Sequence, residues 1–95
     1  MIRSFGDRAT EALFHGERVS RRVPATIRAG AVRKLDVLNS ARTLQDLRSP
    51  PGNRLEALRG DLRGFHSIRV NAQWRVVFRW ASGDALDVQL VDYHG

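Results

Sequence analysis

Apolar residues recur at helical spacing in the first half of the chain and at alternate positions in the second half. This pattern predicts a short helix over residues 8–15 and a longer helix from Pro24 to about Ala41. Residues 2–5 alternate between apolar and polar side chains, which predicts a short opening strand. Four apolar side chains share one face of the longer helix and are expected to enter the core: Ile27, Ala31, Leu35 and Leu38.

The second half of the chain predicts a sheet. Residues 49–53 contain two prolines and a glycine, so we expect a loop there that is neither helix nor strand. Beyond this loop we expect only strands, connected as a meander. The predicted strands span residues 55–58, 65–70, 74–80 and 85–92. Two helices followed by a sheet predict an α+β fold in a single domain over residues 1–95: a compact antiparallel β-sheet with the two N-terminal helices packed on one face.

Strand alternation divides the side chains of this sheet between two faces. One face is apolar and is expected to cover the helices: Ile68, Val70, Trp74, Val76, Phe78, Trp80, Leu86, Val88 and Leu90. The other face is polar and basic: Ser67, Arg69, Arg75, Arg79, Gln89, Val91 and Tyr93. The last hairpin loop is centred near residue 83, so we expect Arg75 to lie opposite about Val91, with Tyr93 as its diagonal neighbour.

The net charge points to a polyanionic ligand. The 95 residues include 16 Lys and Arg against 10 Asp and Glu, a formal charge of +6. Lys34 is the only lysine, so almost all of this charge is carried by guanidinium groups, whose planar donors match phosphate oxygens. A small basic domain of this kind is typical of nucleic-acid binding, although a merely solvated basic surface is the alternative.

Other classes of site and location are disfavoured. The chain has no cysteine, which excludes disulfides and thiolate metal sites. His15, His66 and His94 lie far apart and match no metal-ligand spacing, so we expect no metal and no cofactor. We find neither an apolar run long enough to span a membrane nor a signal peptide, and we therefore expect a cytoplasmic protein without membrane association.

The end of the last predicted strand carries three groups suited to chemistry. Asp92, Tyr93 and His94 supply an acid, a phenol and an imidazole after an apolar run. Because Asp92 and His94 have the parity of the apolar face, we expect the strand to end or twist near Asp92. Together with the arginines, these residues indicate an enzyme that acts on a polyanion.

Several stretches, taken in order, carry a family resemblance: residues 1–5, 49–56, 58–61, 67–75 and 92–94. With them the chain resembles, over essentially its whole length, the HigB-type killer proteins of the RelE/ParE toxin superfamily. The resemblance implies a bacterial type II toxin that enters the ribosomal A site and cuts mRNA there. It also implies a cognate antitoxin, usually a helix-turn-helix protein, through which the pair binds operator DNA. The family's fold agrees with the sheet and helices expected above.

The resemblance and the residue chemistry together suggest roles. Metal-independent cleavage uses the RNA 2′-hydroxyl as nucleophile. Arg75 matches the family's arginine after the tryptophan and is expected to stabilise the phosphate. Arg59 stands where related toxins often carry lysine; it keeps the charge but does not transfer protons. His94 is the expected acid or base, because its ordinary pKa suits both tasks, and Asp92 is expected to orient it or share the proton work. Tyr93, counted with these catalytic residues, is expected to stack on a base, with proton transfer by its hydroxyl as the alternative.

Four further residues are expected to contact RNA: Arg69, Asn71, Gln73 and Arg79. Two alternatives stay open, a ParE-like inhibitor of a protein target such as gyrase and a nucleic-acid-binding module without chemistry. The residues Asp92 to His94, with Arg59 and Arg75, favour the enzyme because an inhibitor would not need them. The antitoxin is expected either over this site or on the helical side, whose exposed arginines favour the latter: Arg18, Arg21, Arg22 and Arg28.

Overall fold

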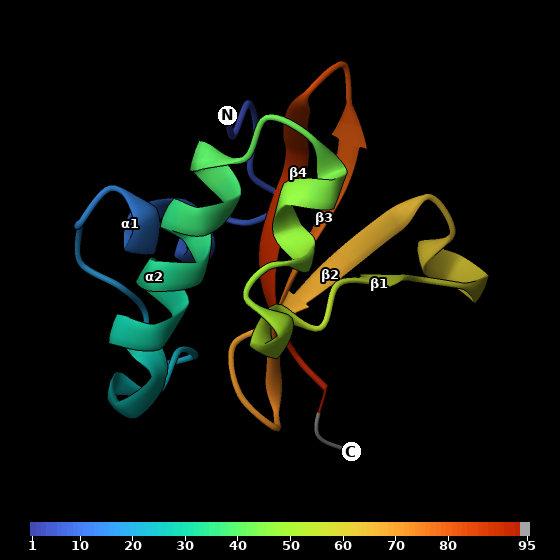
Figure 1. Cartoon of the computed structure of the whole chain (residues 1–95). Helices are drawn as coiled ribbons and strands as arrows, with labels where there is room; N and C mark the ends of the chain where they lie inside the picture. Colours follow the sequence, from blue (N-terminus) through green and yellow to red (C-terminus); the bar gives the residue numbers. More distant parts are fainter. Residues whose placement is uncertain (94–95) are drawn as a thin grey trace.

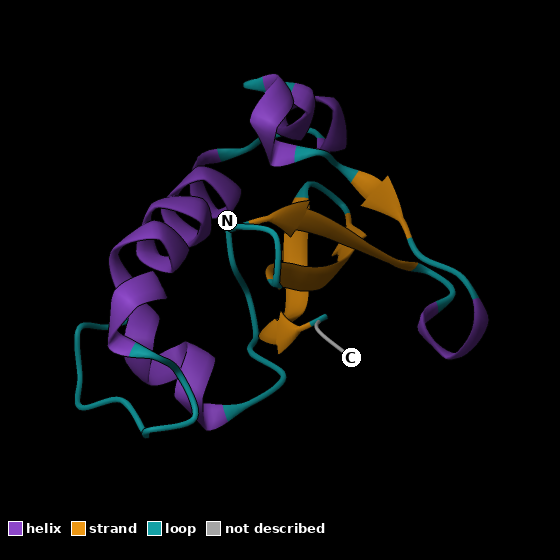
Figure 2. Cartoon of the chain, turned by 90° about the horizontal axis from the view of Figure 1, so that it is seen from below, coloured by secondary structure: helices purple, strands orange, loops and turns teal. Residues whose placement is uncertain are grey.

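The computed structural model describes residues 1–93 (Figure 1). Helices α1 (Arg8–Phe14) and α2 (Ala25–Ser40) precede an antiparallel sheet in which the strand order is β1-β2-β3-β4. The strands are β1 (Glu56–Ala57), β2 (Phe65–Arg69), β3 (Trp74–Ala81) and β4 (Asp84–Asp92). The helical segments form an arc around the sheet (Figure 2). The expected α+β architecture is therefore confirmed.

The two helices begin and pack as their sequences predict. Asp7 caps α1, because its Oδ1 accepts a hydrogen bond of 2.7 Å from the Thr10 backbone N–H. The Thr10 hydroxyl in turn accepts a hydrogen bond of 2.8 Å from the Leu90 N–H, which joins α1 to β4. In α2 the fully buried residues are Ala31, Leu35 and Leu38, whereas Ile27 is half-buried at the edge of the core.

The core lies between the helices and one face of the sheet. Its fully or nearly fully buried sheet residues include Ile68, Val76, Phe78, Val88 and Leu90. Burying a side chain of this size stabilises the fold by roughly 1.5–3 kcal/mol. This packing fixes which face of β2, β3 and β4 is turned away from the helices.

The expectation that residues 49–53 are neither helix nor strand, with only strands after them, is wrong. The described residues contain three short 3₁₀ helices: η1 (Leu44–Arg48), η2 (Pro51–Asn53) and η3 (Gly60–Leu62). Thr43 and Asp46 form a capping box at the start of η1, where backbone N–H groups of Thr43 and Arg42 lower the pKa of Asp46. Pro51 opens η2 because a first-turn residue needs no N–H donor.

The assignment of Leu86 to the core face is also wrong. Val77 pairs with Gln89 but Arg79 pairs with Leu86, so β4 holds one extra residue there. This β-bulge reverses the alternation, and Ala85 instead joins Val88 in the core. Asp87, at the bulge, has φ +52°.

The opening segment pairs with β4 at the bulge. It forms isolated parallel bridges, Ile2 with Ala85 and Phe5 with Val88, in place of the expected strand. The Gly6 N–H donates to the Val88 carbonyl at 2.8 Å, and the Asp87 N–H donates to the Ser4 hydroxyl at 2.9 Å. Contacts between distant parts of the chain therefore accompany the interruption in β4.

Candidate active site

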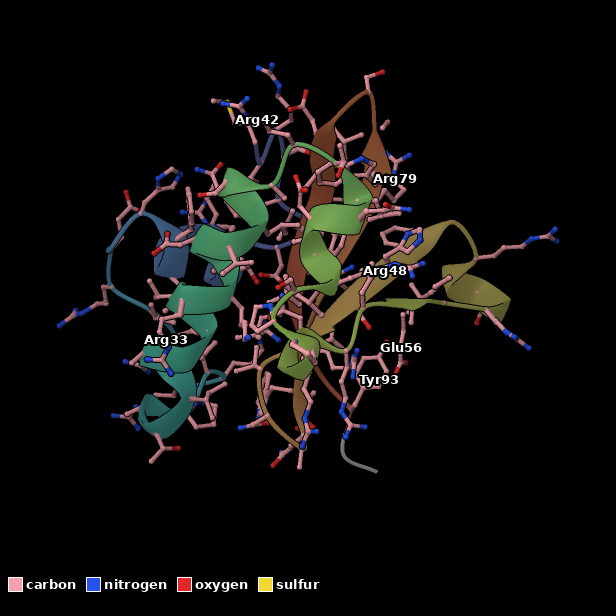
Figure 3. All side chains as sticks on the ribbon, in the orientation of Figure 1. Arg33, Arg42, Arg48, Glu56, Arg79 and Tyr93 are labelled. Carbon is pink, nitrogen blue, oxygen red and sulfur yellow. The ribbon has the colours of Figure 1, made fainter. Side chains whose placement is uncertain are left out.

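A pocket of about 330 Å³ lies where β2 ends and β3 begins, on the side of the sheet away from the core. Its lining comes from the segment before β1, from the β2–β3 turn, and from the ends of β2, β3 and β4: Arg54, Glu56, Arg69, Asn71, Ala72, Arg75 and Tyr93. Four of the expected site residues are thus brought together: Arg69, Asn71, Arg75 and Tyr93. Glu56 and Tyr93 are labelled in Figure 3.

Arg75 is the most firmly held residue of this pocket. It pairs with Val91 on β4, as the hairpin position predicts. Its Nε donates to Ser67 Oγ at 2.7 Å and its Nη2 donates to the Arg54 carbonyl at 2.6 Å. The Arg75 side chain is only 12% exposed, and Ser67 is fully buried. Two of its five N–H donors are therefore given to fixed acceptors, which sets the plane of the guanidinium.

Glu56 is a site residue that the sequence reasoning missed. Its Oε1 lies 3.9 Å from Arg75 Nη1, and its side chain is 57% exposed. Glu56 pairs with Ser67 across β1 and β2, which places its carboxylate beside Arg75. The turn between Gly60 and Gly64 was a usable signal, because its centre gives nearly this register.

The end of β4 is tied to the β2–β3 turn. Asp92 is the last residue of β4, opposite Trp74, so the strand ends where expected. Gln73 Nε2 donates to Asp92 Oδ2 at 3.1 Å, and the Tyr93 N–H donates to the Gln73 carbonyl at 2.6 Å. The Tyr93 residue is 45% exposed.

The turn itself is shaped by Asn71. Its Oδ1 accepts hydrogen bonds of 2.8 Å from the N–H groups of both Gln73 and Trp74. Asn71 therefore has a structural task as well as a place in the pocket lining. His94, expected as acid or base, lies outside the described residues.

Arg59 and Arg79 lie away from the pocket. Arg59 precedes η3, just beyond the Leu58 N–H that bonds to the Phe65 carbonyl. Arg79 pairs with Phe65, whereas Arg75 pairs with Arg69 at the other end of β2. These ends are four residue steps apart along β2, or about 13 Å at a rise of roughly 3.3 Å per residue. The structure thus separates these two arginines from the expected site residues that line the pocket.

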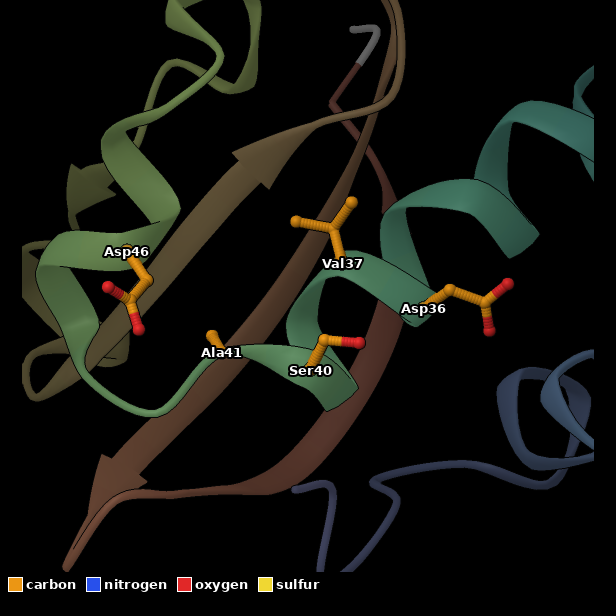
Figure 4. Close-up of a pocket in the computed structure, with 5 residues that line it drawn as sticks. All are labelled: Asp36, Val37, Ser40, Ala41 and Asp46. Carbon is orange, nitrogen blue, oxygen red and sulfur yellow. The ribbon is translucent and has the colours of Figure 1, made fainter.

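A second pocket, of about 420 Å³, lies between the end of α2 and the start of η1 (Figure 4). Its lining contains two carboxylates and no cationic side chain: Asp36, Val37, Ser40, Ala41 and Asp46. Carboxylates repel the phosphates of a polyanion, so this pocket, although larger, suits RNA less well than the one around Arg75.

No group of three or more His, Cys, Asp or Glu side chains within residues 1–93 is arranged to hold a metal ion. His66 stacks on Phe78 with ring centroids 6.2 Å apart, and His15 contacts the rings of Phe5 and Phe14. Both histidines therefore take part in aromatic packing. Within the same residues, no helix has the length and apolar character needed to cross a bilayer.

The family described as the RelE-like toxin of the type II toxin-antitoxin system HigB matches residues 3–94. This chain belongs to the HigB family. It is 42% identical over 90 residues to Toxin HigB-1 of Vibrio cholerae, covering 95% of each protein. It is 33% identical over 94 residues to Endoribonuclease HigB of Proteus vulgaris, covering 99% of this chain and 100% of that protein.

The solved structures show the same fold. A chain of the YoeB-YefM complex from Staphylococcus aureus superimposes with a TM-score of 0.60 at 14% identity, covering 100% of this chain and 99% of that one. The resemblance expected from the motifs is therefore confirmed, and the HigB-family protein is a toxin of a type II toxin–antitoxin system, with a protein antitoxin as its partner.

Proposed function

We propose that this HigB-family toxin is an endoribonuclease that cleaves mRNA in the ribosomal A site without a metal ion. The observation that carries the proposal is the pocket in which Arg75 lies beside the Glu56 carboxylate and the Tyr93 ring. The name of the Proteus relative, an endoribonuclease, supports RNA as the substrate.

Arg75 is the phosphate-binding group of this proposal. Ser67 and the Arg54 carbonyl fix its orientation before RNA arrives. A charged donor that is already oriented stabilises negative charge developing on phosphorus without reorganising at the moment of reaction. Arg75 therefore acts on the scissile phosphate.

Glu56 and His94 carry the protons. The 2′-oxygen bonds to phosphorus while the bond from phosphorus to the 5′-oxygen breaks. The 2′-hydroxyl proton passes to the Glu56 carboxylate, which lies beside Arg75, and the leaving 5′-oxygen takes its proton from His94. Asp92, two residues before it in sequence, orients His94 or stabilises its charge. General acid–base catalysis of this kind contributes roughly 10²–10⁴-fold in rate.

The remaining residues bind RNA. The half-exposed Tyr93 ring stacks on a base next to the cleaved bond. Arg69 and Asn71 contact RNA from the pocket lining, and Gln73 does so from the adjoining turn. Arg59 and Arg79 lie at the other end of β2 and contact phosphates away from the cleaved bond.

The ribosome supplies the substrate and much of the binding surface. A charge of +6 favours docking on ribosomal RNA, and that docking weakens with added salt because each neutralised phosphate releases counterions. The protein then acts in the cytoplasm, where ribosomes are found. A helix-turn-helix antitoxin neutralises it, and the pair binds operator DNA through that antitoxin.

The antitoxin contacts the connector between α1 and α2 in this proposal, where Arg18 and Arg21 are exposed. Arg22 is less suited to a test because its Nη2 bonds to Asp7 Oδ2 at 3.2 Å and supports the cap of α1. Reversing the charge of Arg18 and Arg21 together should weaken antitoxin binding in a titration and leave RNA cleavage unchanged. A complex of wild-type affinity with reduced cleavage would place the connector on the ribosome-facing side.

The activity is tested by primer extension on an mRNA after induction, with translation active and with translation blocked. Cuts in the translated mRNA that disappear without translation are expected, together with slow cleavage of free RNA by the purified protein. Rapid cleavage of free RNA would contradict ribosome dependence. Intact mRNA together with inhibited DNA supercoiling would support the gyrase-directed alternative.

A further inference from the structure

Lys34 is the only lysine of the chain, and it does not serve as a solvated surface charge. It lies on α2, is half-buried, and its Nζ donates to Asn53 Oδ1. Its neighbour Arg33 is exposed (Figure 3). Two adjacent cations on one helix therefore differ in role, since only Lys34 reaches across to the segment that leads into β1.

Asn53 is the partner that makes this contact structural. It is fully buried, and its Nδ2 donates to the carbonyls of Leu47 and Ser49, each at 3.2 Å. Its backbone N–H donates to the Pro50 carbonyl at 2.9 Å. One amide thus joins α2, η1 and the segment between η1 and η2, and Lys34 completes its set of hydrogen bonds.

Arg54, the residue after Asn53, connects this anchored segment with the pocket. Arg54 has φ +45° and ψ +58°, a left-handed conformation that residues other than glycine adopt uncommonly. Its carbonyl accepts the 2.6 Å hydrogen bond from Arg75 Nη2. An unusual backbone geometry held at a ligand-binding pocket points to a functional requirement. The direction of the Arg54 carbonyl depends on where Asn53 holds the chain.

We propose that Lys34 and Asn53 are positioning residues that orient the Arg75 guanidinium through the Arg54 carbonyl. The inference rests on the proposed function, in which Arg75 binds the scissile phosphate. A lysine suits this place because a compact ammonium on a flexible stem bonds to a single amide oxygen, whereas a guanidinium presents a planar fork. The only lysine in an arginine-rich chain therefore makes a partly buried contact that connects α2 with the segment whose Arg54 carbonyl accepts from Arg75.

The test compares Lys34→Met with Arg33→Met in single-turnover cleavage on programmed ribosomes. Lys34→Met is expected to lower the maximal rate about tenfold, since small misplacements of catalytic groups cost up to roughly 10²-fold. The toxin concentration that gives half-maximal rate should stay within about twofold of wild type, because the RNA-facing groups are unchanged. Arg33→Met removes a neighbouring cation and should change neither value.

A second measurement reads the orientation of Arg75 directly. The ¹⁵N NMR signal of the Arg75 Nε–H group should shift in Lys34→Met and stay in place in Arg33→Met. Adding Lys34→Met to Arg75→Ala should lower the rate less than about twofold further, because residues that act through one another are not additive. Lys34→Leu, which also removes the donor, replaces Lys34→Met if the latter does not fold.

A wild-type rate and an unshifted Arg75 signal in folded Lys34→Met or Lys34→Leu would overturn the proposal. An equal loss of rate in the wild-type and Arg75→Ala backgrounds would also overturn it, because Lys34 would then act independently of Arg75. If Arg75→Ala itself cleaves at the wild-type rate, the proposed function fails, whereas the NMR shift still decides whether Lys34 positions Arg75.

Discussion

Arg75 and Arg79 lie on the same strand and the same face, four residues apart, yet their surroundings differ. Arg75 is 12% exposed and bonds to the buried Ser67 hydroxyl and to a backbone carbonyl. Arg79 is 49% exposed and bonds to Asp87, which is 41% exposed. Exposed pairs of the second kind contribute about 0–1 kcal/mol and hold no fixed geometry. Residue type alone therefore does not distinguish the two arginines; burial and fixed acceptors single out Arg75, the phosphate-binding group of the proposed function.

The largest effect is expected from His94, to which the proposed function assigns the leaving-group proton. His94→Ala should lower cleavage by about 100-fold or more and abolish toxicity, because it removes the group proposed to protonate the leaving oxygen. Growth after induction and circular dichroism of the purified variant measure toxicity and folding. Growth arrest at the wild-type level would remove His94 from the site.

Replacing the two arginines tests the comparison itself. Arg75→Ala should lower the single-turnover rate at least about tenfold, since one lost electrostatic donor costs up to roughly 10²–10³-fold. Arg79→Ala is the matched control and should stay within about threefold of wild type, because its contacts are exposed. Equal losses in both variants would show that the buried surroundings of Arg75 confer no special role.

The acceptors can be removed instead of the arginines. Ser67→Ala takes away the hydroxyl that bonds to Arg75 Nε and should lower the maximal rate several-fold, about threefold to tenfold. The control is Asp87→Asn, which changes the acceptor of Arg79. Asparagine tolerates the positive φ of residue 87. The control should cleave at the wild-type rate. A wild-type rate for Ser67→Ala would mean that the Arg54 carbonyl alone orients Arg75.

The smallest effect concerns stability at the hairpin end of the sheet. The hydrogen bond from Arg3 holds the pKa of Asp84 below its ordinary value of 3.8. A lowered folded-state pKa contributes stability that is present above the unfolded value and lost as pH falls through the folded value. The denaturation midpoint of the wild type should therefore fall more than that of Asp84→Asn between about pH 5 and pH 3. Parallel declines would assign the acid sensitivity to other carboxylates.

Local pattern was enough to predict the helices, the meander and the pairing of Arg75 with Val91, because each depends on spacing along nearby residues. The bulge at Asp87 was missed because it accompanies pairing with the opening segment more than 80 residues away, including the Ser4 hydroxyl. Glu56 was missed because a two-residue strand leaves little alternation to read. A contact between distant segments therefore accompanies the missed bulge, whereas the short length of β1 concealed Glu56.

The single lysine makes it possible to measure local unfolding of α2 by proteolysis. A protease that cuts only after lysine has one place to cut, within α2, and Lys34 is half-buried and hydrogen-bonded there. Cleavage requires that stretch of helix to unwind, so its rate under native conditions reports how often α2 opens. The amount of cleaved fragment, measured over time by mass spectrometry, would then report the frequency of opening at this one position without a label.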